Sequence, residues 1–337
     1  MDSILISIIV PIYNTGPFLR RCLDSLLALR EENLEFILVN DGSTDDSESI
    51  CKLYQEKDVR FSYYFKSNGG LSSARNHGMK YSCGRYLAFL DSDDYLEKNF
   101  SSVLVAAIGK HPVNIIGFNH FYIKGGKSSK IQSPYPKNQI IGKKESFEIL
   151  KNATWNLCLF FVWNRIFERE WLLKNNIWFD ETLLLAEDKS FNADAIANAS
   201  QQFHLDETLI NYVFYENSLS QARYKPKLLQ KYEAQFRALI TIYQKNGLLE
   251  KDEFAHDIAC NYLGHAFLMQ MNNLSHSGES MVKGLTEMRI SPIYSFSFAH
   301  FKGHKRFSMF VSGLIWLFRV RLFRPLVLLF KFSKAIQ

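Results

Sequence analysis

The feature that most constrains this chain is the regular alternation of apolar runs and amphipathic segments over its first hundred residues. Residues 4–13 (ILISIIVPIY) form a nearly continuous apolar run, typical of a strand buried on both faces of a parallel sheet. Residues 14–29 place apolar side chains at helical spacing, with Pro17 near the predicted helix start. Further strands are predicted at 35–40, 61–65 and 86–90, with helices between them. This rhythm predicts βαβ units and an α/β fold with a mostly parallel, Rossmann-like sheet that has helices on both faces.

The rhythm loosens after residue 97, and from about residue 225 the pattern is helical. The 337 residues suffice for two domains. We therefore predict an α/β domain over 1–220, with a ligand-binding half (1–97) and a second half (98–220). A helical C-terminal region (221–337) follows.

The basic charge of the chain is concentrated at its C-terminal end. The formal net charge is +6, and residues 291–337 contain eight Lys and Arg but no Asp or Glu, which leaves the remainder of the chain at −2. A nucleic-acid-binding protein would carry its basic stripe on the folded domain. The distribution therefore argues against a nucleic-acid partner.

The basic tail at about 305–334 is rich in aromatic and aliphatic residues. Its longest run without charge, residues 307–318, is shorter than the roughly 20 residues that span a bilayer. Basic residues spaced through an apolar helix are typical of a helix that lies in the membrane interface. We expect such a helix to bind a membrane surface, and the alternative is that it packs on the body of the protein or in a homodimer.

The cysteines and the N-terminus point to a reducing compartment. The five cysteines are widely spaced, odd in number and without a C-x-x-C pair, so neither disulfides nor a zinc site is indicated. The N-terminus lacks the basic region of a signal peptide and is interpreted as a strand. Together with the tail, this predicts a cytoplasmic protein peripherally associated with the inner face of the plasma membrane.

Four polar, turn-rich segments follow the four predicted strands. In doubly wound sheets ligands bind beyond the carboxyl ends of the strands. Four segments are therefore expected to meet at one edge: 11–15 (PIYNT), 40–45 (NDGSTD), 67–76 (SNGGLSSARN) and 91–94 (DSDD).

The acidic segment is the candidate metal site. If strand geometry persisted, Asp91 and Asp93 would point the same way and offer two hard oxygen donors, which suit Mg²⁺ or Mn²⁺. The cation would relieve the repulsion between the carboxylates and hold a diphosphate. The alternative is a solvated turn in which Ser92 or Asp94 caps the next helix.

The second and third segments offer ligand contacts of another kind. Asp41 could accept a nucleobase N–H, with Gly42 permitting a tight turn close to the ligand. Arg75 and Asn76 offer a guanidinium group and an amide to a phosphate or a ribose. The alternatives are an Asx turn for Asp41 and an ordinary surface helix for Arg75.

Taken in order, the segments SIIVPIYN, VNDGSTDDS, NGGLSSARNHG and YLAFLDSDDYL resemble the successive motifs of the family 2 glycosyltransferases, which have the GT-A fold. The resemblance is strong over 4–97 and loose to about 220, and it implies that 1–97 is a nucleotide-binding half and 98–220 an acceptor half. It implies metal-dependent, inverting transfer of a sugar from a nucleotide diphosphate sugar. It assigns metal binding to Asp93 and Asp91, with Asp93 favoured as the direct ligand. By position it assigns donor contacts to Pro11, Tyr13, Asn14, Asp41, Arg75, Asp91 and Ser92.

The resemblance also implies a general base beyond the D-x-D motif, in an acidic pair that begins a helix. Glu187 and Asp188 occupy that setting in AEDKSFN, with Asp188 favoured as the base. A helix N-terminus stabilises carboxylates, so a capping pair is the alternative. The segment FVWNRIF makes Trp163 and Asn164 candidate acceptor-side residues, although Trp163 could equally belong to the core.

The expected function is the addition of one hexose or N-acetylhexosamine, with a UDP-sugar as the default donor. The expected acceptor is a glycan or a lipid-linked glycan of the cell surface. The chain lacks the Q-x-x-R-W segment of processive synthases, which favours single addition. A nucleotidyltransferase would carry a basic, glycine-rich loop after its first strand, which PIYNTGPF does not provide. A nucleotide-sugar-binding scaffold without strong catalysis stays as the alternative.

Overall fold

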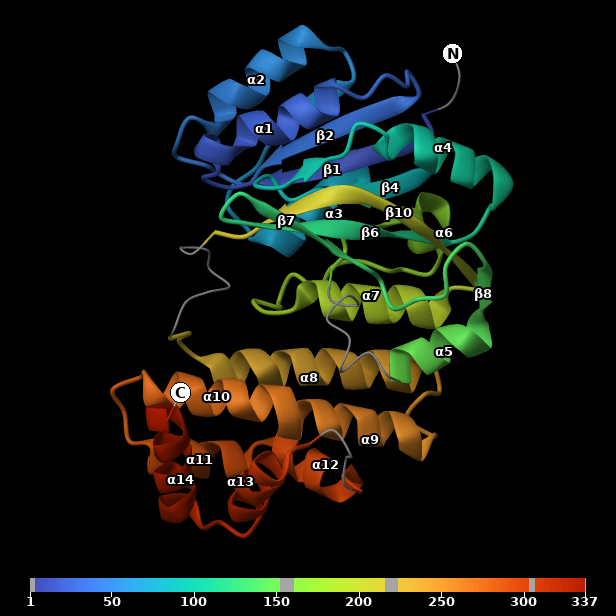
Figure 1. The fold of residues 1–337 in the computed structure, drawn as a ribbon. Coiled ribbons are helices and arrows are strands. Elements are labelled where there is room, and N and C mark those ends of the chain that lie inside the picture. Colours follow the sequence, from blue (N-terminus) through green and yellow to red (C-terminus); the bar gives the residue numbers. More distant parts are fainter. Residues whose placement is uncertain (1–3, 152–160, 216–223, 303–306, 337) are drawn as a thin grey trace. The chain divides into compact units, whose positions relative to one another are not determined.

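The structure is a computed structural model, and it describes residues 4–151, 161–215, 224–302 and 307–336. The chain divides into two compact units (Figure 1). Unit 1 comprises residues 1–150 and 156–216, and unit 2 comprises residues 151–155 and 217–337. The boundary predicted at 220 falls outside the described residues.

The described residues of unit 1 form one sheet of ten strands. Eight of them follow the order β3-β2-β1-β4-β9-β6-β10-β5, while β7 pairs with β6 and β8 pairs with β10. Their bounds are β1 (Ile6–Ile12), β2 (Leu34–Asn40), β3 (Phe61–Phe65), β4 (Tyr86–Phe89), β5 (Tyr95–Leu96), β6 (Ile115–Lys124), β7 (Lys127–Ile131), β8 (Ile140–Gly142), β9 (Arg165–Glu168) and β10 (Gln201–Val213).

The first four strands form the parallel half of the sheet. β1 pairs in parallel with β2 and β4, and β2 pairs in parallel with β3. All seven residues of β1 are buried, as expected for a strand covered on both faces. The predicted parallel arrangement is therefore confirmed for this part of the chain.

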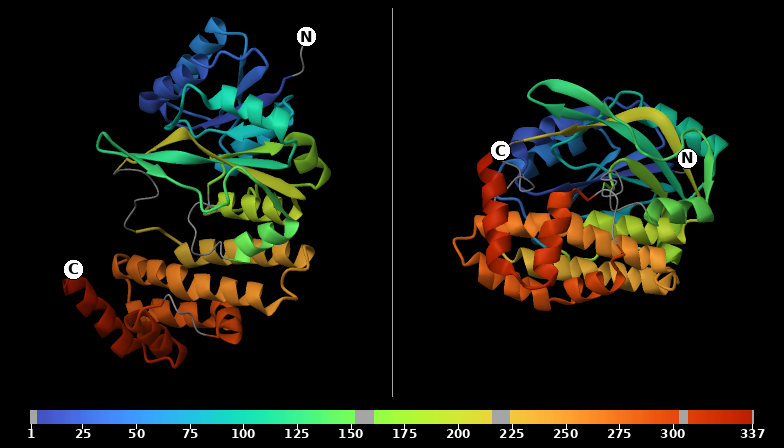
Figure 2. Two further views of the ribbon diagram at one scale, coloured as in Figure 1. Left: turned by 45° about the vertical axis from the view of Figure 1, so that its right-hand side comes forward. Right: turned by 60° about the horizontal axis from the view of Figure 1, so that its bottom comes forward.

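Helices cover both faces of this half, in agreement with the predicted fold class. Ile8 and Val10 belong to one core cluster with residues of α1 (Gly16–Leu27) and α2 (Ser47–Lys57). Ile9 lies on the opposite face, where a Cβ on Gly78 of α3 (Leu71–Tyr81) would approach its Cγ2 to 2.3 Å. Figures 1 and 2 show α1 and α2 on one side of the strands and α3 on the other. Glycine at 78 thus lets α3 lie close to β1.

The second half of the sheet is mixed. β9 runs antiparallel to both of its neighbours, whereas β10 is parallel to β6. β6 and β7 form a hairpin that turns at Gly125 and Gly126, both at positive φ. The other helices in the described residues of the unit are α4 (Phe100–Lys110), α5 (Lys143–Lys151), α6 (Arg169–Lys174) and α7 (Glu187–Asn198).

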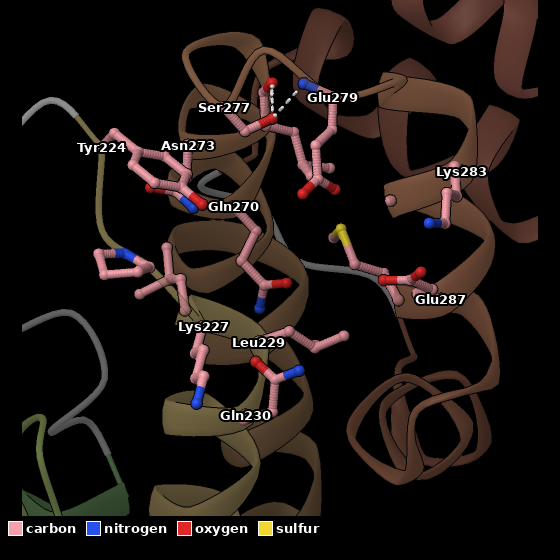
Figure 3. Close-up of a pocket in the computed structure, with 15 residues that line it drawn as sticks. Tyr224, Lys227, Leu229, Gln230, Gln270, Asn273, Ser277, Glu279, Lys283 and Glu287 are labelled. Carbon is pink, nitrogen blue, oxygen red and sulfur yellow. Dashed lines mark hydrogen bonds between the residues drawn. The ribbon is translucent and has the colours of Figure 1, made fainter.

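The described part of unit 2 is helical, as predicted. It contains α8 (Leu228–Lys245), α9 (Asp252–Asn261), a π-helical turn (Tyr262–Ala266), α10 (Phe267–Ser275), α11 (Met281–Ile290), α12 (Pro292–His300), α13 (Met309–Arg319) and α14 (Phe323–Ile336). The start of α8 encloses a pocket together with α10 and α11 (Figure 3). Among the described residues, no helix has both the length and the apolar character needed to cross a membrane.

The basic tail forms two helices, which corrects the expectation of a single one. α13 ends at Arg319, and Arg321 adopts a left-handed backbone with φ of 62° before α14 begins at Phe323. Pro325 lies in the first turn of α14, where proline fits because its missing N–H has no intrahelical partner there. Several large apolar side chains of the pair are exposed, led by Met309 at 93% and Leu328 at 70%.

Candidate active site

The loops after β1 and β2 are tied together at the predicted edge of the sheet. Asn14 has a left-handed backbone with φ of 51°, and its side-chain oxygen accepts a hydrogen bond of 2.8 Å from the backbone N–H of Thr44. Its own backbone N–H donates to the Ser43 hydroxyl at 3.0 Å. Tyr13 is 51% exposed beside this junction, whereas Pro11 is buried within β1. Tyr13 therefore has surface available to a ligand, whereas Pro11 does not.

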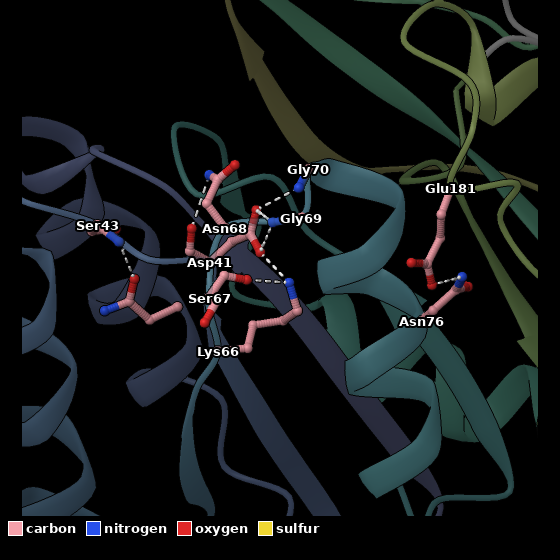
Figure 4. A network of polar contacts seen from close by, with 10 residues as sticks. Asp41, Ser43, Lys66, Ser67, Asn68, Gly69, Gly70, Asn76 and Glu181 are labelled. Carbon is pink, nitrogen blue, oxygen red and sulfur yellow. Dashed lines mark hydrogen bonds and ion pairs between the residues drawn. The ribbon is translucent and has the colours of Figure 1, made fainter.

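Asp41 organises the loop that follows β3 (Figure 4). One carboxylate oxygen accepts from Lys66 Nζ at 2.5 Å and from the backbone N–H of Gly69 at 3.0 Å, and the other accepts from the Gly70 N–H at 2.8 Å. A Cβ on Gly42, whose φ is 78°, would approach the backbone nitrogen of Asn68 to 2.9 Å, so this tight turn requires glycine. Asp41 thus positions the glycine-rich loop, and its contact with a nucleobase stays a prediction.

The side chain of Asn76 makes its hydrogen bonds within the chain. Its amide nitrogen donates to the Phe179 carbonyl and to the Glu181 carboxylate, both at 2.9 Å, and its oxygen accepts from the Phe179 N–H at 3.0 Å. These bonds fasten the segment before α7 to α3. Asn76 therefore serves to bring the predicted acidic pair towards the sheet edge.

Arg75 is the centre of the site. Its guanidinium group pairs with Asp91 at 2.8 Å and with Asp188 at 2.5 Å, and lies 3.6 Å from the Glu187 carboxylate. The side chain is only 1% exposed and its Cζ lies 5.2 Å from the centre of the Phe179 ring. One buried cation thus joins two acidic motifs that are about a hundred residues apart in the sequence. The predicted donor contact of Arg75 stays a prediction, since in this structure its terminal nitrogens face carboxylates.

Asp188 lies in the first turn of α7, two residues after Ala186, which has a left-handed backbone with φ of 55°. One carboxylate oxygen pairs with Arg75, and the other accepts a hydrogen bond of 3.1 Å from the Val162 N–H. Burial raises the pKa of Asp188, the Arg75 guanidinium opposes this rise, and the neighbouring Glu187 and Asp91 add to it. The group therefore holds its proton at a higher pH than an ordinary aspartate.

The D-x-D segment is a turn beyond the end of β4. The strand ends at Phe89, and the Asp94 N–H closes the turn by donating to the Asp91 carbonyl at 3.0 Å. The argument that strand alternation aligns Asp91 with Asp93 therefore does not apply here. Asp94 is 1% exposed and one of its oxygens accepts from the Val213 N–H at 2.8 Å, which anchors the turn to β10. Ser92 is also buried, at 5% exposed.

The carboxylates of this turn carry more negative charge than the surrounding residues neutralise. Burial, followed by repulsion from Asp91, raises the pKa of Asp93 to about 6. The same two causes and repulsion from Asp93 raise the pKa of Asp94, whose second oxygen has no hydrogen-bond partner among the described residues. Unneutralised hard oxygen donors fit a divalent cation. The described residues contain no group of three or more His, Cys, Asp or Glu arranged to hold a metal, so a cation here would take further ligands from a diphosphate and water.

Arg21 was not predicted as a site residue. Its guanidinium group donates to the Asp93 carbonyl at 2.7 Å and to the Tyr215 hydroxyl at 2.8 Å, and it lies over the Tyr95 ring. Arg21 lies in the second turn of α1. This helix begins directly after the loop that follows β1, at the same sheet edge as the other polar segments. A basic residue so close to that edge is the signal that could have identified it.

The predicted acceptor-side residues are buried. Trp163 is 3% exposed and stacks on Phe161 and Tyr212, with ring centres 4.6 and 5.4 Å away. Asn164 is 2% exposed, and its backbone carbonyl accepts from the Phe118 N–H at 3.0 Å. The structure thus favours the core alternative for Trp163, and an acceptor contact for either residue stays a prediction.

Comparisons with known proteins identify the family to which this sequence is related. The sequence model described as "Glycosyl transferase family 2" matches residues 7–174. The chain is 36% identical over 244 residues to "Uncharacterized glycosyltransferase EpsJ" of Bacillus subtilis. This alignment covers 72% of this chain and 71% of that protein. It is 36% identical over 189 residues to "Minor teichoic acid biosynthesis protein GgaB" of the same organism, covering 54% of this chain and 20% of that protein.

Among solved structures, S. aureus TarS 1–349 in complex with UDP-GlcNAc superposes with a TM-score of 0.73 at 20% identity. The alignment covers 99% of this chain and 92% of TarS 1–349. This likeness confirms the predicted GT-A fold class with its helical C-terminal region.

Proposed function

Because this chain belongs to glycosyl transferase family 2, we propose that it transfers a single sugar, with inversion, from a UDP-sugar to a hydroxyl group of a growing cell-surface glycan. The observation that carries the proposal is the buried Arg75, which holds Asp91 of the D-x-D segment and Asp188 of the acidic pair at one point. Inverting transfer needs these two functions together, since one group faces the leaving diphosphate and the other the attacking hydroxyl.

The donor is proposed to bind over the loops after β1, β2 and β3. Tyr13 offers an exposed ring for a nucleobase, and the Asn14 and Asp41 contacts hold the surrounding loops in place. TarS shares this fold and was solved with UDP-GlcNAc, which supports a UDP-sugar as donor.

Asp93 and Asp91 are proposed to hold Mn²⁺ or Mg²⁺, which when bound would neutralise charge on the departing diphosphate. Arg21 would hold the D-x-D turn by its bond to the Asp93 carbonyl. Ser92 and Asp94, both buried, would keep the turn's shape. The raised pKa of Asp93 is consistent with a carboxylate that needs a cation partner.

Asp188 is proposed to take the proton from the acceptor hydroxyl as that oxygen attacks the anomeric carbon. An efficient base has a pKa near the working pH, and burial moves the pKa of Asp188 upwards in that direction. A carboxylate has about four lone-pair sites, so the bonds from Arg75 and Val162 leave room for the hydroxyl. Glu187 is more exposed and farther from Arg75, which makes it the second choice.

The cell-surface acceptor and the membrane association rest on other observations. GgaB is described as a teichoic acid biosynthesis protein, which supports a surface polymer as acceptor. The exposed apolar side chains of α13 and α14 include Trp316 and Phe332, and Arg319 and Arg324 lie on the same two helices. Exposed apolar side chains beside basic ones suit the inner leaflet of a membrane. The four cysteines of the described residues are free, as in a reducing cytoplasm.

The test is UDP release from a panel of UDP-sugars by the purified chain, with and without Mn²⁺, followed by the same assay on Asp188→Asn. We expect metal-dependent release from one donor class and a loss of at least about 100-fold in the variant, because the base is removed while the side-chain shape is kept. Asp252→Asn, which changes an exposed aspartate of unit 2, is the matched control. Near-normal turnover by Asp188→Asn would refute the assignment of the base, and donor binding without any UDP release would favour a scaffold.

A further inference from the structure

A polar pocket of about 370 Å³ lies within unit 2, apart from every residue used in the proposed transfer (Figure 3). Its walls come from the start of α8, from α10 and from α11, with the turn between α10 and α11 closing one end. The volume lies in the range of small-molecule sites. The pocket is therefore large enough for a ligand and is not explained by the α/β site.

A buried amide faces this pocket without a partner. Gln270 is 3% exposed, and its amide nitrogen has no hydrogen-bond partner among the described residues. Figure 3 shows the side chain extending from α10 into the space beside Leu229 and Gln230. Leaving a buried N–H unpaired is costly, so a native structure that does so calls for an explanation such as a ligand.

The rim of the pocket is held in place by its own hydrogen bonds. The Asn273 amide accepts from the Lys225 N–H at 2.6 Å and donates to the Lys225 carbonyl at 3.0 Å, which fixes the start of α8 against α10. The Ser277 hydroxyl donates to the Leu274 carbonyl at 2.9 Å and accepts from the Glu279 N–H at 3.1 Å. These bonds preorganise the walls, which lowers the cost of binding.

The lining favours a neutral, hydroxyl-rich ligand. Lys227 and Lys283 balance Glu279 and Glu287, so neither an anion nor a cation is preferred overall. The unpaired Gln270 amide excludes a purely apolar occupant, because such a ligand would leave the amide without a partner. Tyr224 is 42% exposed at the rim and offers a flat apolar surface to the C–H face of a sugar ring. Amides and carboxylates form hydrogen bonds with sugar hydroxyls, and an aromatic ring packs against the C–H face of a sugar ring. The lining of the pocket contains groups of all three kinds.

We propose that this pocket is a saccharide-binding site, which holds an uncharged segment of a glycan by hydrogen bonds to Gln270 and to the Glu279 and Glu287 carboxylates. That the bound glycan is the acceptor or the product of the transfer rests on the proposed function. The binding of a neutral saccharide to this pocket does not depend on that function. The site would retain the glycan on the enzyme independently of the loops that bind the donor.

The test is saturation-transfer NMR on the full chain with neutral disaccharides as probes, namely gluco-, galacto- and N-acetylglucosamine-based, and with glycerol phosphate as the charged comparator. We expect at least one neutral disaccharide to bind and Gln270→Leu to weaken it about tenfold, because a buried hydrogen-bond donor is removed. Glu279→Gln, at an exposed position, should weaken binding without affecting folding. Gln244→Leu, an exposed glutamine of α8 outside the pocket, should leave binding unchanged.

Thermal unfolding separates this role from a structural one. A ligand-binding Gln270 predicts that Gln270→Leu is at least as stable as the parent chain, since it removes an unpaired buried amide. Metal-dependent UDP release without acceptor should stay unchanged in the same variant, so loss of that release would signal failure of the α/β site instead. The proposal is overturned if no neutral disaccharide binds, if only glycerol phosphate binds, or if neither Gln270→Leu nor Glu279→Gln weakens binding.

Discussion

Replacing Asp93 by asparagine should stabilise the metal-free protein at alkaline pH. The pKa of Asp93 lies at about 6, against an ordinary value of 3.8, because burial and Asp91 disfavour its charged form. When folding raises the pKa of an acid, ionisation of that acid lowers the free energy of unfolding. The contribution of Asp93 to the free energy of unfolding is therefore fully present below about pH 4, and it is lost as the pH rises through about 6.

The magnitude follows from the difference between the two pKa values. At about 1.4 kcal/mol for each pKa unit, the ionised carboxyl destabilises the native state by about 3 kcal/mol above pH 7. Asp93 is partly exposed, so solvent screening makes this an upper bound. Asparagine keeps the size of the side chain and removes the charge.

The assay is urea unfolding of both proteins in the presence of a chelator, at pH 8 and at pH 4.5. We expect the variant to be more stable at pH 8 by up to about 3 kcal/mol and the gain to shrink at pH 4.5. Adding Mn²⁺ with UDP should stabilise the parent chain more than the variant, because only the parent keeps both carboxylates. A variant that is equally or less stable than its parent at pH 8 would refute the reasoning.

Three further results are expected. Arg75→Met should lower stability by about 3–5 kcal/mol in urea unfolding at neutral pH, because it leaves three carboxylates without their buried cation; unchanged stability would contradict the central role of Arg75. The transfer rate should rise with pH through the raised pKa of Asp188, since only the ionised form accepts a proton, and a flat pH–rate profile would count against that base. In sedimentation with vesicles, the chain should bind anionic ones more than zwitterionic ones, and Arg319→Gln with Arg324→Gln should reduce binding; equal binding to both vesicle types would favour the dimer alternative.

The parallel half of the sheet was predictable because its strands have a distinctive composition. A strand such as β1 is covered on both faces and must be apolar at consecutive positions, as at Ile8, Ile9 and Val10. The edge of the sheet that collects polar loops then follows from topology alone. The direction of β9 did not follow, because a short apolar run looks the same whether its strand runs parallel or antiparallel.

The site was predictable as a set of motifs, and much less so as a set of contacts. The order of the strands predicts that Arg75 and Asp91 lie at one sheet edge, and the family resemblance adds Asp188, but hydrogen-bond partners depend on tertiary distances. Arg75 was therefore predicted to contact a phosphate or a ribose, and its pairing with Asp91 and Asp188 was not foreseen. The break in the tail was missed for a related reason, since Arg321 carries no local signal for a left-handed backbone.

The shared guanidinium of Arg75 has a consequence for building hybrid enzymes. Exchanging residues 98–220 with those of a relative to obtain a new acceptor preference would keep Arg75 and Asp91 but import a different acidic pair. Unless the imported segment places a carboxylate within reach of the guanidinium, Arg75 would be left buried with part of its charge uncompensated. Productive crossovers should therefore be chosen by whether they preserve this three-way contact, and recombination within the segment should spare the turn at Ala186 that sets where α7 begins.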